Sequence, residues 1–231
     1  MEHTIKLYSN EDIYYLNKMT LKKGQIHVWK IFWKDMEEYI KGKYGILDFS
    51  EREKVAAYLR NEDKMRYMTG KVISKQIISQ YLGIKEQDVK FTANTYGKPQ
   101  ISSSLNKKGL QFNIAHSGDV VLFAFAFDVK VGVDVEYIKE FPNYMELAEK
   151  SFSEAEYLYI EKSRRLIAFY EVWTSKEAYV KSIGEGLSHG LKDFSILNYQ
   201  VIEKGILQNG WKIYPIEIDK HVAHMVVGIE L

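Results

Sequence analysis

The segment 120-VVLFAFAFDVKVGVDVE-136 predicts two consecutive β-strands near the middle of the chain. Its first part, residues 120–127, is apolar almost without interruption, which is typical of a strand buried on both faces. Residues 128–130 have the composition of a turn. In residues 131–136 valine then occupies every second position, so we expect a second strand that presents its valines to one face.

This second strand places two carboxylates side by side. Because side chains alternate along a strand, Asp134 and Glu136 share a face with Gly132. Neighbouring carboxylates beside a residue without a side chain suit a hard cation and an approaching phosphate. A solvated strand face is the more frequent reason for such a pair, so the pair alone does not establish a metal site.

The composition describes a folded globular protein of 231 residues, long enough for one large domain or two small ones. Hydrophobic residues make up 46% of the chain and aromatic residues 14%, too many for a disordered protein. The 32 basic and 31 acidic residues leave a net charge of +1, so no bulk field draws the protein to nucleic acid. Because cysteine is absent, disulfides, thiolate metal ligands and cysteine nucleophiles are excluded.

The sequence also predicts where the protein works. The first residues, MEHTIKLYSNEDIYYLNK, contain acids and no apolar core, so we expect no signal peptide. No apolar run approaches the length of a membrane span. We therefore expect a cytoplasmic protein with no membrane segment.

The first half of the chain combines a strand with helices. Residues 24–33 predict a strand, and Ser50 with Glu53 has the pattern of a capping box that would begin a helix over residues 51–60. A longer helix is expected over residues 63–81, where apolar residues recur at intervals of three and four and predict one buried stripe.

The second half of the chain repeats this order. Ser153 and Glu156 form a second capping-box pattern, and a long helix is expected over residues 164–183. Three strands, near residues 194–197, 211–217 and 223–230, close the chain. The predicted fold class is α+β, and a faint echo links RYMTGKVISKQII of the first long helix with FYEVWTSKEAYVK of the second.

The second long helix carries further charged residues. Glu177 and Lys181 are four positions apart and lie on one helix face, a spacing that usually reflects a surface ion pair. Together with Asp134 and Glu136, Glu177 supplies a third carboxylate for one Mg²⁺ ion. Cations suited to a polyphosphate are scattered along the chain at Arg52, Lys54, Arg66, Lys98, His116, Lys176 and Lys181.

Several motifs in a fixed order resemble one family. VGVD at residues 131–134 is followed by WTSKEAYVK at residues 173–181. This pair resembles the signature of the Sfp-type 4′-phosphopantetheinyl transferases. Further matches are YGKP at 96–99, FNIAHSG at 112–118, FSEAE at 152–156 and GLS at 186–188. The similarity extends from about residue 49 to near the C-terminus.

The resemblance implies a fold of two similar α+β lobes related by a pseudo-twofold axis, with coenzyme A bound in the cleft between them. The lobes would be residues 1–130 and residues 131–231, and the helix echo would be a trace of duplication. A chain that carries both lobes is expected to be a monomer.

The resemblance also implies roles for individual residues. The metal ligands would be Asp134, Glu136 and Glu177. The coenzyme A contacts would be Lys54, Arg66, Lys98, His116 and Lys181, with Lys181 on the pyrophosphate. The chain departs from the family pattern where Glu51 replaces a phosphate-binding lysine and Ala115 replaces a serine.

The activity implied is transfer of 4′-phosphopantetheine from coenzyme A to a serine hydroxyl of an apo acyl or peptidyl carrier protein. Mg²⁺ would assist, with Mn²⁺ as the alternative cation, and adenosine 3′,5′-bisphosphate would leave. A serine hydroxyl needs a base, which would be Glu177, or Glu156 through a water; Lys181 would stabilise the leaving group.

Three other functions stay open at this stage. A different Mg²⁺-dependent phosphotransferase could use the same acids, although no glycine-rich Walker pattern is present. A non-catalytic module that binds coenzyme A or a carrier protein is the second, although a pure binder needs no metal triad. The third is a metal-free structural domain in which these charges form surface pairs.

Overall fold

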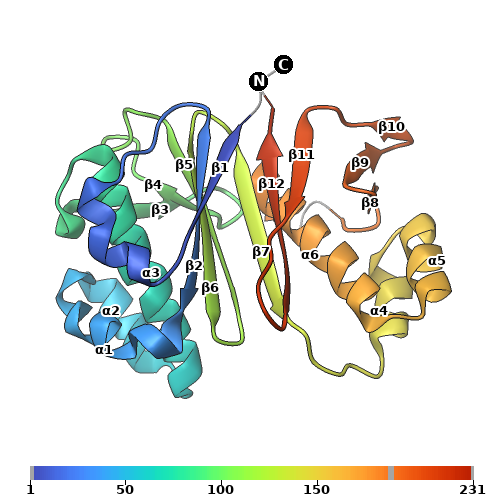
Figure 1. Cartoon of the computed structure of the whole chain (residues 1–231), viewed down its shortest axis with the longest axis horizontal. Helices are drawn as coiled ribbons and strands as arrows, with labels where there is room; N and C mark the ends of the chain where they lie inside the picture. Colours follow the sequence, from blue (N-terminus) through green and yellow to red (C-terminus); the bar gives the residue numbers. More distant parts are fainter. Residues whose placement is uncertain (1–2, 187–189, 230–231) are drawn as a thin grey trace. The chain divides into compact units, whose positions relative to one another are not determined.

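The computed structural model describes residues 3–186 and 190–229, and these residues form an α+β protein (Figure 1). The predicted α+β class is therefore confirmed. The sequence match at residues 186–188 falls mostly outside the described residues. Within the described ranges, no helix is both long enough and apolar enough to cross a membrane.

The chain divides into two compact units. The N-terminal unit contains residues 3–92 and 99–128, and the C-terminal unit contains residues 93–98 together with the chain from residue 129 onward. Each unit has its own main sheet and its own long helix. The strands β6 (Val120–Phe127) and β7 (Val131–Tyr137) are both confirmed, but they belong to different sheets.

The N-terminal unit is built on a four-stranded sheet of order β1-β2-β6-β5. Strand β2 (Gln25–Phe32) matches the predicted first strand, and both β2 and β5 (Leu110–Ser117) run antiparallel to β6. Strand β1 (Thr4–Tyr8) runs parallel to β2 at the edge of the sheet and was not predicted. This short strand is largely exposed, so it lacks the apolar run by which a buried strand is recognised.

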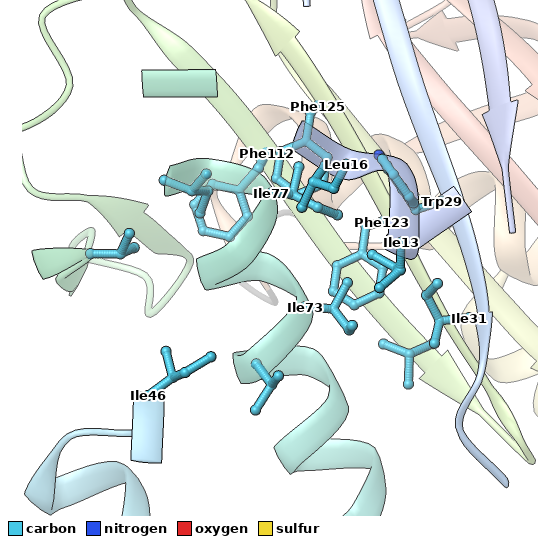
Figure 2. Close-up of a cluster of buried hydrophobic side chains, with 14 of the residues drawn as sticks. Ile13, Leu16, Trp29, Ile31, Ile46, Ile73, Ile77, Phe112, Phe123 and Phe125 are labelled. Atoms are coloured by element: carbon cyan, nitrogen blue, oxygen red, sulfur yellow. The ribbon is translucent and has the colours of Figure 1, made fainter. Parts of the chain in front are cut away.

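Helix α3 (Asn61–Leu82) supplies the other side of this core. The predicted stripe of Met65, Met68, Val72, Ile73, Ile77 and Tyr81 is buried, which confirms the helical periodicity. Figure 2 shows Ile73 and Ile77 among the aromatic side chains Trp29, Phe112, Phe123 and Phe125 of the sheet. The other elements up to residue 101 are short: the 3₁₀ helices η1 (Glu11–Lys18), η2 (Trp33–Met36), η3 (Tyr44–Ile46) and η4 (Glu86–Asp88), helix α1 (Glu37–Gly42), and strands β3 (Phe91–Ala93) and β4 (Pro99–Ile101).

The capping box predicted from Ser50 and Glu53 is wrong by two residues. Helix α2 (Phe49–Ala57) is capped by Asp48, whose carboxylate accepts a hydrogen bond from the Glu51 amide at 3.0 Å. The Glu51 side chain in turn accepts from the Asp48 amide at 3.0 Å. Ser50 instead donates its hydroxyl to Asp48. The carboxylate two residues earlier therefore takes the capping position, one of the residue types that helix N-termini prefer.

The C-terminal unit has a main sheet of antiparallel order β11-β12-β7, against which helix α6 (Leu166–Ile183) packs. Helices α4 (Tyr144–Ser151) and α5 (Glu154–Ser163) precede α6, and the predicted capping box of Ser153 and Glu156 is confirmed at the start of α5. The remaining strands are β8 (Phe194–Leu197), β9 (Gln200–Glu203), β10 (Ile206–Leu207), β11 (Trp211–Pro215) and β12 (His221–Gly228).

The two units contain the same buried ion pair. In the N-terminal unit, Lys75 of α3 lies 2.6 Å from Glu51, the acid of the first capping box. In the C-terminal unit, Lys176 of α6 lies 2.8 Å from Glu156, the acid of the second. Both lysines are fully buried and follow a serine in the two echoed helix sequences. The echo therefore corresponds to a shared structural feature, in which a long helix is tied to the capped helix before it.

Gly132 has a different role from the one expected. A Cβ atom at this position would lie 2.1 Å from the Ala178 carbonyl oxygen and 2.4 Å from the Ser182 amide nitrogen, both in α6. The space beside Gly132 is therefore occupied by the helix backbone and is not available to a cation or phosphate. Gly132 allows α6 to pack directly on β7.

Replacing Gly132 with Ala is expected to destabilise the protein by about 1–3 kcal/mol or more, because α6 would have to move away from β7. Urea unfolding measures the change. Gly42→Ala is the matched control, since a Cβ at Gly42 meets nothing within 4 Å. Equal unfolding midpoints for the two variants would show that α6 does not approach β7 this closely.

Candidate active site

The acids of β7 lie on the strand face against which α6 packs at Gly132. Asp134 and Glu136 share that face, and Glu177 and Lys181 lie four residues apart on the helix. The Lys181 ammonium lies 2.5 Å from Oδ1 of Asp134. Thus the ion pair formed by Lys181 joins helix to strand; it is not the pair with Glu177 that helical spacing alone suggested.

Asp134 is the most perturbed group of this cluster. Its side chain is almost fully buried, and Oδ2 has no hydrogen-bond partner among the described residues. Burial raises the pKa of Asp134 to about 7; Lys181 opposes the rise, and the nearby carboxylates of Glu136 and Glu177 add to it. Lys181 and the three carboxylates therefore form one charged cluster.

The chemistry of these donors fits Mg²⁺, which prefers carboxylate oxygens. The unpartnered oxygen of Asp134 and its raised pKa both mark a place where an added cation would be favourable. In the part of the chain that the structure describes, however, no three acidic, histidine or cysteine side chains are drawn together around one point. The donor set fits the ion, while the side chains have the arrangement of an ion pair between Lys181 and Asp134.

The two carboxylates considered as the base occupy opposite environments. Glu177 is half-buried, and its side chain has no hydrogen bond or ion pair with any of the described residues. Its negative charge acts on Asp134, which places it beside the acid cluster.

Glu156 is fully buried, and its oxygens are fully engaged. Both lie 2.8 Å from Lys176 Nζ, one accepts from the Ile196 amide at 2.6 Å, and the other accepts from Ser153. Lys176, offered by the sequence as a phosphate-binding cation, is equally buried. Burial lowers the pKa of Lys176 to about 8, against the opposing effect of Glu156. This pair is a structural link, so the geometry favours Glu177 as the base.

Lys98 belongs to the C-terminal unit, where it lies in the turn formed by residues 93–98. The Lys98 ammonium donates to the carbonyl oxygens of Val131 and Ser182, each at 3.4 Å. Asn94 fixes the turn by donating to the Gly184 carbonyl at 2.7 Å. Burial, with a smaller effect of Lys130, lowers the pKa of Lys98 to about 8. The turn thus places a cation without a carboxylate partner at the start of β7 and the end of α6.

The other predicted coenzyme A contacts belong to the N-terminal unit. Arg66 donates to the Gly118 carbonyl at 2.7 Å, and it pairs with Asp63. Gly118 follows His116 by two residues, so the structure brings Arg66 to the turn after this exposed histidine. Lys54 is exposed and stands over the Tyr67 ring, 5.0 Å from its centroid. Arg52, by contrast, donates to backbone carbonyls of its own unit and serves the local structure.

Sequence reasoning missed the neighbour of Asp134 on the next strand. His224 of β12 lies directly across from Asp134, and its Nδ1 is 2.7 Å from Thr174 Oγ1 of α6. The pairing depends on the register between β7 and β12, to which no local pattern points. His224 therefore ties α6 to the sheet beside the acid cluster.

The stability of the metal-free protein is expected to fall as pH rises from about 4 to about 7 through Asp134. In this range the folded protein retains a proton on Asp134 that the unfolded chain, with an ordinary pKa, has lost. Asp134→Asn should remove this dependence. Urea unfolding in EDTA at acidic and at mildly alkaline pH measures it, and parallel pH profiles for the two proteins would contradict the raised pKa.

Comparisons of the sequence with known proteins identify one family. Residues 130–223 match a family model described as the 4′-phosphopantetheinyl transferase superfamily, and residues 32–127 match the N-terminal model of a 4′-phosphopantetheinyl transferase. The 4′-phosphopantetheinyl transferase psf-1 of Bacillus pumilus is 30% identical over 70% of this chain and 68% of its own. Sfp of Bacillus subtilis is 35% identical over 65% and 66%. HetI of Nostoc sp. is 28% identical over 74% and 73%.

Proposed function

Since the chain belongs to the 4′-phosphopantetheinyl transferase superfamily, we propose that it transfers the 4′-phosphopantetheine group of coenzyme A to a carrier protein. The acceptor is a serine hydroxyl of an apo acyl or peptidyl carrier protein, and the other product is adenosine 3′,5′-bisphosphate. The observation that carries the proposal is the cluster of Asp134, Glu136, Glu177 and Lys181, with its unpartnered carboxylate oxygen.

Asp134, Glu136 and Glu177 would hold Mg²⁺, or Mn²⁺ as the alternative. When bound, the ion supplies positive charge that neutralises and orients the pyrophosphate of coenzyme A. Lys181 stabilises the charge that develops on the leaving phosphate, since its ammonium is already held in the cluster by Asp134.

Glu177 accepts the proton of the attacking serine hydroxyl. The hydroxyl is a weak nucleophile and must lose its proton as the bond to phosphorus forms. A half-buried carboxylate without a partner in the described structure is suited to this role, whereas the engaged carboxylate of Glu156 is not.

The phosphates of coenzyme A would be held by the cations of both units: Lys54, Arg66, Lys98 and His116. In this proposal residues 1–130 and 131–231 are the two lobes of the family, and coenzyme A binds between them as the resemblance implies. Arg66 must exchange its Asp63 partner for phosphate, so binding at this residue involves a local rearrangement of charge. A single chain with both lobes would act as a monomer.

Intact mass spectrometry of an apo acyl carrier protein and an apo peptidyl carrier protein tests the reaction. Each is incubated with this protein, coenzyme A and Mg²⁺, with EDTA as the control. We expect a metal-dependent mass gain of one phosphopantetheine group on at least one carrier. Binding of coenzyme A without any gain would indicate a non-catalytic module, and absence of both binding and gain would overturn the proposal.

A further inference from the structure

The C-terminal unit contains a pocket that the acid cluster does not use. It has a volume of about 220 Å³ and lies between the N-terminal half of α6, the end of α5 and the turn joining β8 to β9. Its chemically distinctive lining residues are Tyr159, Arg165, Glu171, Tyr199 and His224. A second pocket of about 470 Å³ adjoins it and shares Glu171, Tyr199 and His224.

His224 lines this pocket and can offer it a hydrogen-bond acceptor. The Thr174 hydroxyl donates its single proton to the Tyr170 carbonyl at 2.7 Å, so it can only accept from Nδ1 of His224, which lies 2.7 Å away. In the neutral imidazole with its proton on Nδ1, Nε2 carries a lone pair. His224 is buried, and the contact with Thr174 is the hydrogen bond that the described structure gives its ring.

Two opposite charges line the same pocket without pairing. Arg165, the N-cap residue of α6, forms no side-chain hydrogen bond or ion pair in the described structure. Glu171 accepts only a long hydrogen bond, 3.4 Å, from the Tyr159 hydroxyl. Burial raises the pKa of Tyr159, Glu171 adds to the rise and Arg165 opposes it, so both charges lie near this phenol. Arg165 is exposed and Glu171 is half-buried, so both charges are accessible to a ligand in the pocket.

A tight turn holds the aromatic wall in place. Asn198 and Tyr199 both have positive φ, 51° and 60°, as expected for the two central residues of a type I′ hairpin turn. The turn brings the Tyr199 ring to 6.0 Å from the His224 ring. The pocket therefore combines an apolar surface with a cation, an anion and an acceptor.

We propose that this pocket binds a small zwitterion, a free α-amino acid. The ligand carboxylate pairs with Arg165, and its ammonium donates to Glu171 and to Nε2 of His224, while the side chain packs on Tyr199. A simple anion would face Glu171 and the lone pair of His224, and a simple amine would face Arg165, so neither satisfies all three groups. The volume is below that of pockets for drug-sized ligands and suits a smaller molecule.

Thermal unfolding of the full chain with L-alanine, L-serine or L-leucine tests the proposal independently of the transferase activity. Ethanolamine, which lacks the carboxylate, and lactate, which lacks the amine, are the matched compounds at the same concentration. We expect at least one amino acid to raise Tm in a concentration-dependent way and the matched compounds to leave it unchanged. Absence of any amino-acid effect, or an equal effect of ethanolamine or lactate, would overturn the assignment.

Variants at the two charges locate the site. Arg165→Gln and Glu171→Gln should each weaken binding about tenfold or more, as expected when a charge-assisted hydrogen bond is lost. Arg164→Gln and Glu161→Gln are the matched controls, because these residues are exposed and do not line the pocket. A Tm increase that persists in both pocket variants would place the ligand elsewhere and refute the proposal.

Discussion

Glu177→Gln is expected to lower the rate of phosphopantetheine transfer by about 10²–10⁴-fold, the range for loss of a general base. The amide cannot accept the serine proton and is a weaker ligand for a hard cation, so both proposed roles of Glu177 are lost. Stability should be unchanged, because the Glu177 side chain has no hydrogen bond or ion pair in the described structure. The rate is measured by intact mass spectrometry of the carrier protein, and stability by urea unfolding.

Glu154→Gln is the matched control for this variant. Glu154 is exposed in the first turn of α5, outside the acid cluster, so its replacement should leave the rate unchanged. The pH–rate profile separates the roles of Glu177: loss of the acidic limb is expected if the residue is the base. A rate near that of the wild-type protein would remove Glu177 from the mechanism.

Glu156→Gln is expected to destabilise the protein by about 3–5 kcal/mol, the cost of leaving a buried charge without its partner. The Lys176 ammonium would then donate only to the Phe194 carbonyl and to the neutral side-chain amide introduced at position 156. The folded protein already lowers the Lys176 pKa to about 8, and the variant should lower it further. The unfolded chain binds the proton more readily, so the variant should gain stability as pH rises towards about 10.

The double variant Glu156→Leu with Lys176→Met shows whether Glu156→Gln loses stability because a charge is left unpaired or because packing is disturbed. Removing both charges should recover much of the stability lost in Glu156→Gln, because no buried ion then lacks its partner. Urea unfolding of the three proteins gives the comparison. If Glu156→Gln were as stable as the wild-type protein, the buried ion pair would not hold α5 to α6.

Local sequence patterns were sufficient for much of the fold. The apolar run of β6, the alternation of β7 and the periodicity of α3 each predicted an element that the structure contains. The same alternation placed Asp134 and Glu136 on one face. These predictions succeeded because side-chain direction within a strand or helix follows from backbone geometry alone.

Distant parts of the chain decided which charged side chains are buried and which groups they pair with. The sequence left Glu156 and Glu177 as equal candidates for the base, and only the packing of α5, α6 and β8 shows that one is enclosed with Lys176. Likewise the sequence predicted room for a cation and a phosphate beside Gly132, but the backbone of α6 fills that space.

The sequence by itself determined the α+β class, the long helices and which acids share a face, since these depend on residues a few positions apart. The tertiary structure alone decided that Lys181 pairs with Asp134, that Asp134 keeps an unpartnered oxygen, and that His224 lies opposite it. The physical reason is that the free energy of a charged group depends on the water and partners around it. Those are set by whichever segments fold over the group, at any separation in sequence.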